Sequence, residues 1–172
     1  MEGFFTHLIS YLVSKPYLKG EAELFKGEYQ HNIDDKGRFV IPSKLRDGLG
    51  SSFVLTRGLD GCLFAYTVAG WGNLEKDLRR LSFTKADARA FSRQFLSGAN
   101  DIDVDKQFRV LIPPTLREHA GLEKDIVILG VGSRVEIWDK NRWEKYYSKS
   151  SSEYESVAEK LVDFDCDFDL ED

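Results

Sequence analysis

Residues 34–46 have the sequence DDKGRFVIPSKLR, and 71 positions later residues 105–117 have the sequence DKQFRVLIPPTLR. Gly50 is matched by Gly121 at the same offset. Seven of these 17 aligned positions are identical, whereas ordinary composition would give about one match. The sequence therefore predicts a duplicated supersecondary unit, whose function is carried out twice in each chain.

The composition is that of a globular protein. The chain has 172 residues, of which 42% are apolar and 13% aromatic, enough for one core or two small ones. Its two cysteines, Cys62 and Cys166, lack the spacing of a zinc site or a disulfide framework, which indicates a reducing compartment such as the cytoplasm. No segment has the length and hydropathy of a membrane span, and residues 1–19 lack the basic start of a secretory signal.

The net charge of -5 is unevenly distributed along the chain. Residues 148–172 carry nine acidic and two basic side chains, so residues 1–147 carry 22 basic against 20 acidic. Acidic and apolar residues alternate over 163–172, a pattern typical of disordered or partner-binding tails. The acidic average does not exclude nucleic-acid binding, because such binding depends on a local basic surface.

Each copy has the pattern of a strand, a tight turn, a strand, a short helix and two further strands. In the first copy we expect strands at 25–33 and 38–41 on either side of a glycine-containing hairpin turn, with Pro42 at the start of the helix. This pattern predicts an α+β fold of two pseudo-symmetric units joined by helices. The expected segments are an N-terminal extension at 1–23, a first repeat at 24–70, a helical linker at 71–97, a second repeat at 98–147, and a C-terminal helix with an acidic tail at 148–172.

An aspartate and an arginine flank each expected turn, four residues apart. Asp34 stands with Arg38, and Asp105 with Arg109. One such pair alone is equally well explained by an exposed salt bridge, worth roughly 0–1 kcal/mol. Because both copies keep the pair, we interpret it as a device that holds a guanidinium ready for phosphate or guanine. Further basic residues stand near the turns in the sequence: Lys36, Lys44 and Arg46 near the first, and Lys106 and Arg117 near the second.

The sequence carries no recognisable catalytic or metal-binding motif. His7, His31 and His119 share no motif, and nothing resembles a nucleophile elbow or a phosphate-binding loop. Cys62 lies among apolar residues, which favours a buried side chain over a nucleophile. We therefore expect a protein that is not an enzyme, with no cofactor, no metal and no small-molecule substrate.

Several motifs between about Leu24 and Tyr147 resemble those of the MraZ family, and they occur in the same order. They are FKGEY at 25–29, DDKGR at 34–38, LTRGLDGCL at 55–63, RVLIP at 109–113 and IWD at 137–139. The resemblance implies a bacterial transcriptional regulator with an AbrB-like swapped-hairpin barrel, which binds promoter repeats upstream of the division and cell-wall gene cluster. It also implies a ring-shaped homo-oligomer associated with the nucleoid.

The resemblance also assigns the residues that contact double-stranded DNA. The expected site residues are the DNA-binding Arg38, Arg109, Lys36 and Lys106, with Asp34, Asp105 and Gly37 as motif partners. Phe108, however, stands where the second motif usually has glycine, and a bulky residue resists a positive φ. We therefore expect the second turn to be strained or differently shaped, and Arg109 to contribute less than Arg38. Residues 1–23 precede the family pattern, and we expect them to contribute little to the core.

The expected function is sequence-specific DNA binding by a homo-oligomer. Each copy is too small to cover its apolar strands alone, and linked sites raise the affinity of a weakly basic protomer. The alternative is a protein-interaction scaffold that uses the acidic tail and in which the hairpins are only structural. Salt separates the two, because DNA binding weakens steeply as the salt concentration rises and apolar scaffold contacts do not.

Overall fold

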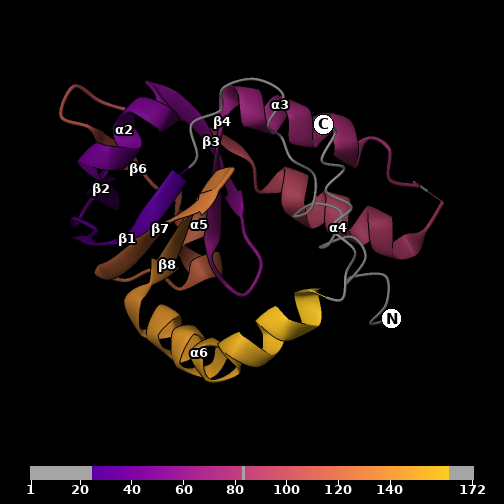
Figure 1. Cartoon of the computed structure of the whole chain (residues 1–172). Coiled ribbons are helices and arrows are strands. Elements are labelled where there is room, and N and C mark those ends of the chain that lie inside the picture. Colours follow the sequence, from indigo (N-terminus) through magenta and orange to yellow (C-terminus); the bar gives the residue numbers. More distant parts are fainter. Residues whose placement is uncertain (1–24, 83, 163–172) are drawn as a thin grey trace, which may run out of the picture. The chain divides into compact units, whose positions relative to one another are not determined.

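The computed structural model describes residues 25–82 and 84–162, so the expectations for residues 1–23, Cys166 and the acidic tail at 163–172 lie outside the described residues. The chain divides into two compact units, one ending at Asp139 and the other beginning at Lys140. The elements of the first unit (Figure 1) are β1 (Phe25–Asn32), β2 (Arg38–Val40), α2 (Ser43–Leu49), β3 (Ser52–Arg57), β4 (Leu63–Thr67), α3 (Val68–Leu78), α4 (Ala86–Ser97), β5 (Asn100–Asp103), β6 (Arg109–Leu111), α5 (Pro114–Ala120), β7 (Asp125–Gly132) and β8 (Arg134–Asp139).

The strand order shows that the two copies are intertwined. Six antiparallel strands follow the order β1-β7-β8-β4-β3-β5, and β2 pairs with β6 in a separate two-stranded antiparallel ribbon. When each strand is replaced by the equivalent strand of the other copy, the order reads the same in reverse. The centre of this pseudo-symmetry lies where Phe64 of β4 faces Glu136 of β8. The predicted mixed α+β fold and the predicted duplication are confirmed.

Two details of the expected fold are wrong. The strands on either side of the first turn do not form a hairpin ladder with each other, because β1 pairs with β7 and β2 pairs with β6. Turn residues fix only the local reversal of the chain, whereas apolar packing far along the sequence selects the partner of a strand. The six-stranded sheet is also open rather than closed as a barrel, since β1 and β5 are its two edges among the described residues.

The main core lies between one face of the sheet, the ribbon and two short helices. It joins alternate strand residues such as Leu55 and Ile137 to Leu45 of α2, Leu116 of α5 and Phe39 of β2. A proline precedes each helix at its N-cap, and only the apolar side of each short helix is buried. This core therefore fixes the ribbon against both copies at once.

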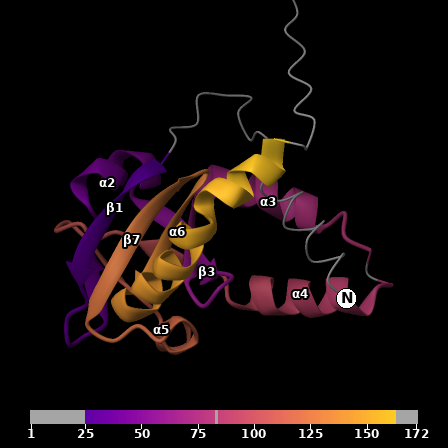
Figure 2. The ribbon, with the colours of Figure 1, turned by 60° about the horizontal axis from the view of Figure 1, so that its bottom comes forward.

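The helices α3 and α4 pack against the opposite face of the sheet. Thr56 follows the core residue Leu55 in β3, so its side chain points to the other face, where its hydroxyl donates to the carbonyl oxygen of Phe95 at 2.6 Å. Leu74 and Leu78 of α3 are buried as well. Figure 2 shows α3 and α4 together, away from α2. The ribbon side of the unit is therefore left uncovered by these two helices.

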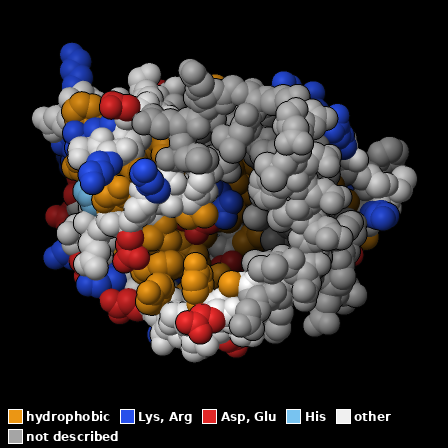
Figure 3. Space-filling model, viewed as in Figure 1, with side chains coloured by type: hydrophobic (Ala, Val, Ile, Leu, Met, Phe, Trp, Pro, Cys, Tyr) orange, Lys and Arg blue, Asp and Glu red, His pale blue; other side chains and the backbone are white. Residues whose placement is uncertain are grey.

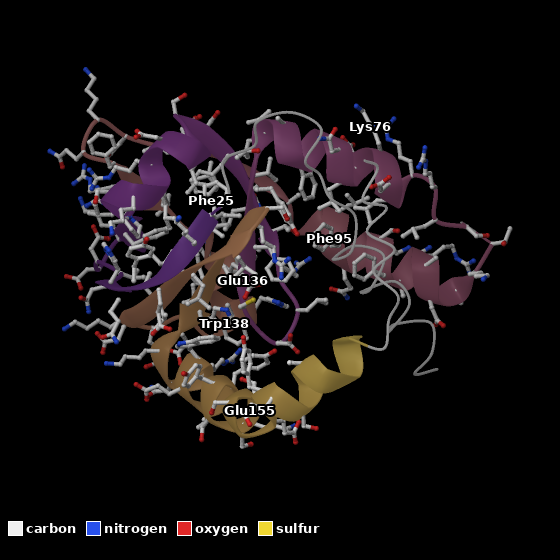
Figure 4. All side chains as sticks on the ribbon, in the orientation of Figure 1. Phe25, Lys76, Phe95, Glu136, Trp138 and Glu155 are labelled. Atoms are coloured by element: carbon white, nitrogen blue, oxygen red, sulfur yellow. The ribbon has the colours of Figure 1, made fainter. Side chains whose placement is uncertain are left out.

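A buried carboxylate lies at the pseudo-symmetry point. Glu136 accepts hydrogen bonds from Arg134 Nη2 at 2.6 Å and from Trp138 Nε1 at 3.0 Å (Figure 4). Cys62 directly precedes β4 and is fully buried, and this burial raises the pKa of its thiol. The thiol therefore stays protonated at neutral pH, in agreement with the predicted buried side chain.

The second unit is the helix α6 (Lys140–Val162). Trp143 stacks on Tyr146 with ring centroids 6.0 Å apart, and Tyr154 and Val157 are exposed farther along the helix. From the sequence we expect a C-terminal helix within 148–172, and α6 begins earlier, at Lys140. Over residues 25–82 and 84–162, no helix, α6 included, is both long and apolar enough to cross a membrane.

Candidate nucleic-acid interface

The first turn, Asp34–Arg38, is closed by hydrogen bonds that converge on one carboxylate. Asp34 Oδ1 accepts from the backbone N–H groups of Lys36 and Arg38, both at 2.9 Å. Its Oδ2 accepts from Arg38 Nε at 2.8 Å and lies 2.7 Å from Nη2 of the same guanidinium. The backbone closes the turn too, since the Asp34 N–H donates to the Arg38 carbonyl at 2.7 Å. One aspartate therefore fixes both the chain reversal and the pose of the arginine.

The second turn, Asp105–Arg109, repeats this geometry. Asp105 Oδ1 accepts from the N–H groups of Gln107 at 2.8 Å and Arg109 at 2.9 Å, and its Oδ2 accepts from Arg109 Nε at 2.7 Å. Phe108 has a φ of 59° where Gly37 has 80°, so the bulky residue adopts a left-handed conformation. Of the two outcomes expected for this turn, strain is observed and a different shape is not.

Both carboxylates are strongly acidic in this geometry. The hydrogen bond from the Arg38 side chain is the largest cause that lowers the pKa of Asp34, from 3.8 to about 2. The backbone N–H of Arg109 is the largest cause that lowers the pKa of Asp105. Each aspartate is therefore ionised at neutral pH and holds its arginine through charge-assisted hydrogen bonds.

The ribbon of β2 and β6 brings the two arginines onto one face. Arg38 is opposite Leu111, and Arg109 is opposite Val40, so these four side chains share one side of the ladder. The two aliphatic residues on that side are exposed, Val40 by 37% and Leu111 by 54%. Phe39 is buried on the other side, where it anchors the ribbon to the core. The result is a solvent-facing surface of two oriented guanidinium groups and two exposed apolar side chains.

The structure places the lysines of the predicted site at opposite ends of this ribbon. Lys36 and Lys106 are both exposed, each in its own turn, and the antiparallel ladder separates the two turns. Gly37 is buried within the first turn. In the space-filling view, Lys and Arg side chains, interspersed with Asp and Glu, lie on the side of α2 and β2 (Figure 3). The predicted site residues thus form one extended surface rather than a pocket.

The helix arginines do not lie where the sequence order places them. Arg46 of α2 follows the first turn in the sequence, yet its Cζ lies 4.1 Å from the centroid of the Phe108 ring in the second turn. Arg117 of α5 lies against Gly37 of the first turn, where an added Cβ would be 2.8 Å from Arg117 Cζ. The exchange of strands between copies carries each helix to the turn of the other copy, which local sequence cannot reveal.

The apolar part of this surface was not predicted from the sequence. In the sequence, Val40 and Leu111 have the pattern of strand residues and Phe108 is a departure from glycine, yet Phe108 is 45% exposed in the structure. The alternation of side chains along a strand could have revealed these apolar residues, because Val40 lies two residues after Arg38 and Leu111 two after Arg109. A strand that exposes its arginine exposes these residues too.

Comparison with known proteins agrees with this arrangement of two copies. The model of the family described as "MraZ protein, putative antitoxin-like" matches twice, at residues 24–94 and 95–165. This chain belongs to the MraZ family. A protein of Heliobacterium modesticaldum named transcriptional regulator MraZ is 60% identical over 142 residues, which cover 83% of this chain and 99% of that protein.

Other members of the family with the same name are similar over nearly the same span. The protein of Moorella thermoacetica is 55% identical over 83% of this chain and 99% of its own length. That of Acetivibrio thermocellus is 58% identical over 81% of this chain and 97% of its own length. The similarity to these MraZ proteins therefore includes both turns and both strands of the ribbon.

Proposed function

We propose that this MraZ protein is a transcriptional regulator that binds double-stranded promoter DNA through the exposed face of the β2–β6 ribbon. The observation that carries the proposal is the placement of Arg38 and Arg109, each locked by its own aspartate, on that one face. Its relatives are named transcriptional regulators, which supports a regulatory role for this chain.

The major groove of B-DNA admits a two-stranded β-ribbon, and we propose that the β2–β6 ribbon binds there. Arg38 and Arg109 stand at opposite ends of a three-residue ladder, so they are offset by two residues, roughly 7 Å along the strands. That offset spans about two base-pair steps. An oriented guanidinium can donate to guanine O6 and N7, while Val40 and Leu111 beside it supply apolar contact for a thymine methyl.

The lysines of the turns complete the proposed contact. Lys36 and Lys106 extend from the two ends of the ribbon, where an ammonium group reaches the phosphates on either side of the groove. We assign these residues to sequence-independent affinity and the two arginines to base recognition. In this proposal, the turn tips supply affinity and the ribbon supplies specificity.

We further propose that the protein acts as a ring-shaped homo-oligomer on promoter repeats of the division and cell-wall gene cluster, as the family resemblance implies. The intertwined copies support the swapped-hairpin arrangement that the same resemblance implies. One weakly basic protomer gains affinity when several ribbons bind adjacent repeats, since linked sites raise the effective concentration. Such DNA binding would place the protein at the bacterial nucleoid.

The test is a gel-shift titration with the DNA fragment upstream of the protein's own gene, at two salt concentrations and beside a scrambled fragment. We expect preference for the promoter fragment and a steep loss of affinity as the salt concentration rises. Native mass spectrometry of the same sample gives the number of chains in the complex. Binding that is absent or independent of salt would favour the protein-interaction scaffold instead.

A further inference from the structure

Each turn of the interface is held by a strand and a helix of the other copy. The Ile41 N–H donates to the carbonyl oxygen of Phe108 at 2.9 Å, and the Ile112 N–H donates to the carbonyl oxygen of Gly37 at 3.0 Å. The accepting residue directly precedes Arg109 in one case and Arg38 in the other. The backbone just before each proposed DNA-binding arginine is therefore fixed from the opposite repeat.

A helix arginine completes each of these connections. Arg46 Nε donates to the Ile41 carbonyl oxygen at 2.9 Å, and its guanidinium lies 4.1 Å from the Phe108 ring centroid. We name this set of three residues the Phe108 clasp. The equivalent Gly37 clasp consists of Arg117 Nε, which donates to the Ile112 carbonyl oxygen at 3.3 Å, and the Arg117 guanidinium packed on Gly37. The two clasps are related by the same pseudo-symmetry as the strands.

We propose that Arg46 and Arg117 are positioning residues for DNA recognition, each acting on the arginine of the other repeat. Arg46 of the first repeat holds the second turn and hence Arg109, and Arg117 of the second repeat holds the first turn and hence Arg38. This inference rests on the proposed DNA-binding function for its effect on affinity, whereas the clasps themselves exist without DNA. Both side chains are half-buried, as expected for residues that pack on protein.

The chemistry of the clasp requires a guanidinium. Its planar group donates along its edge while its face packs on a flat surface, here the Phe108 ring or the backbone at Gly37. A lysine keeps the positive charge but has neither the planar face nor the Nε donor at that distance from the chain. Arginine-to-lysine substitution therefore separates positioning from simple charge, since a direct phosphate contact would survive the change.

The experiment combines Arg46→Lys and Arg117→Lys with Arg38→Ala and Arg109→Ala in double-mutant cycles of promoter binding. We expect each lysine variant alone to weaken binding roughly three- to tenfold, with an unchanged salt slope. The loss from Arg46→Lys should disappear in an Arg109→Ala background and persist in an Arg38→Ala background. The loss from Arg117→Lys should show the reverse pattern. Arg93→Lys, at an exposed position of α4, is the matched control and should leave binding unchanged.

Hydrogen exchange of the DNA-free protein, followed by mass spectrometry, tests the clasps separately from DNA binding. Arg46→Lys should speed exchange in peptides that cover 104–110 and not in those that cover 33–39, and Arg117→Lys should do the opposite. Crossed exchange without any DNA binding would sustain the clasps and reject the proposed function. The inference would be overturned if faster exchange were confined to the turn of the same repeat or were equal in both turns. It would also be overturned if the losses of binding were additive in every double-mutant cycle.

Discussion

The two turns of the ribbon hold their arginines with the same hydrogen bonds, although one turn contains Gly37 and the other Phe108. Arg Nε lies 2.8 Å from the aspartate in the first turn and 2.7 Å in the second. The hydrogen bond from the backbone N–H of residue 37 or 108 to the carbonyl oxygen of the aspartate is also similar in the two turns, at 2.8 Å and 2.9 Å. A change from no side chain to a large aromatic ring has left the hydrogen-bond geometry of the turn intact.

The difference between the turns lies in how each is supported. A left-handed conformation costs a residue with a Cβ about 1–2 kcal/mol, a cost that Phe108 bears and Gly37 does not. Part of that cost is offset because the Phe108 ring packs on the Arg46 guanidinium, a contact worth about 0.5–1 kcal/mol at an exposed site. In the second turn, the shape is therefore set by Asp105 and the Phe108 clasp without a glycine, and we expect Arg109 to be as well placed as Arg38.

The largest expected effect is the loss of either ribbon arginine. Arg38→Ala should cost about 1–3 kcal/mol of binding free energy per site and reduce specificity, if the guanidinium contacts a base. Because the turns share one geometry, we now expect Arg109→Ala to cause a loss of the same size, in place of the smaller loss that Phe108 suggested from sequence. Promoter titrations of both variants at two salt concentrations measure this.

The control for these variants is Arg93→Ala, which removes one exposed positive charge from α4. It should change promoter binding little, since α4 packs on the other face of the sheet from the ribbon. A clearly larger loss in Arg38→Ala than in Arg109→Ala would show that the turns are unequal despite their common geometry. Normal binding by both variants would reject the interface.

The next effect concerns the stability of the first turn. Gly37→Ala places a Cβ at a φ of 80° and 2.8 Å from Arg117 Cζ, so we expect the free energy of unfolding to fall by about 1–2 kcal/mol. Gly72→Ala, in α3 with open space around its Cα, is the matched control and should be neutral or stabilising. Urea denaturation measures both, and an unaffected Gly37→Ala protein would contradict the glycine requirement.

A smaller effect is expected for the second turn. Phe108→Gly relieves the left-handed strain but removes the ring that packs on Arg46 and adds freedom to the unfolded chain, so the net change should stay within about 1 kcal/mol. Phe108→Leu keeps the strain and loses the aromatic face, and it should be the less stable of the two. Should Phe108→Leu prove the more stable variant in urea denaturation, the ring contact does not support the turn.

The smallest effect is a dependence on pH. A carboxyl whose folded pKa lies below its unfolded value stabilises the fold above the unfolded pKa, and that contribution is lost as the pH falls through the folded pKa. For Asp34 this window runs from 3.8 down to about 2, and the pKa of Asp105 is shifted in the same direction. Stability measured from pH 5 to pH 2 should decline less steeply in Asp34→Asn, and an equal decline would contradict the shift.

The local features of this fold could be predicted from the sequence. The chain reversal at 34–38 is closed by hydrogen bonds within five residues, so an aspartate, a glycine and an arginine at fixed spacing were enough to predict it. The proline before each short helix and the β-branched residues in the strands also favour their local structure through short-range effects, so the helices and strands could be predicted from them. The duplication allowed each local prediction to be checked against a second copy of the same pattern.

The partners of these elements could not be predicted in the same way. Residues 25–33 and 38–41 fit a hairpin ladder with each other as well as with the other copy, because alternation fixes which face is buried and not which strand lies alongside. The positions of Arg46 and Arg117 depend on that choice, so sequence order assigned each of them to the wrong turn. Pairing across the copies is a property of the whole packed core.

The exchange of strands between the copies has a consequence for synthesis of the chain. Phe25 of β1 pairs with Gly132 of β7, so nearly the whole first unit must be translated before the first strand finds its partner. At about 5–20 residues per second, a ribosome leaves β1 unpaired for roughly 5–20 s. Pairings of such high contact order also form slowly once the chain is complete. Neither repeat can mature ahead of the other, and the nascent first repeat is the stage at which this protein is most exposed to misassociation.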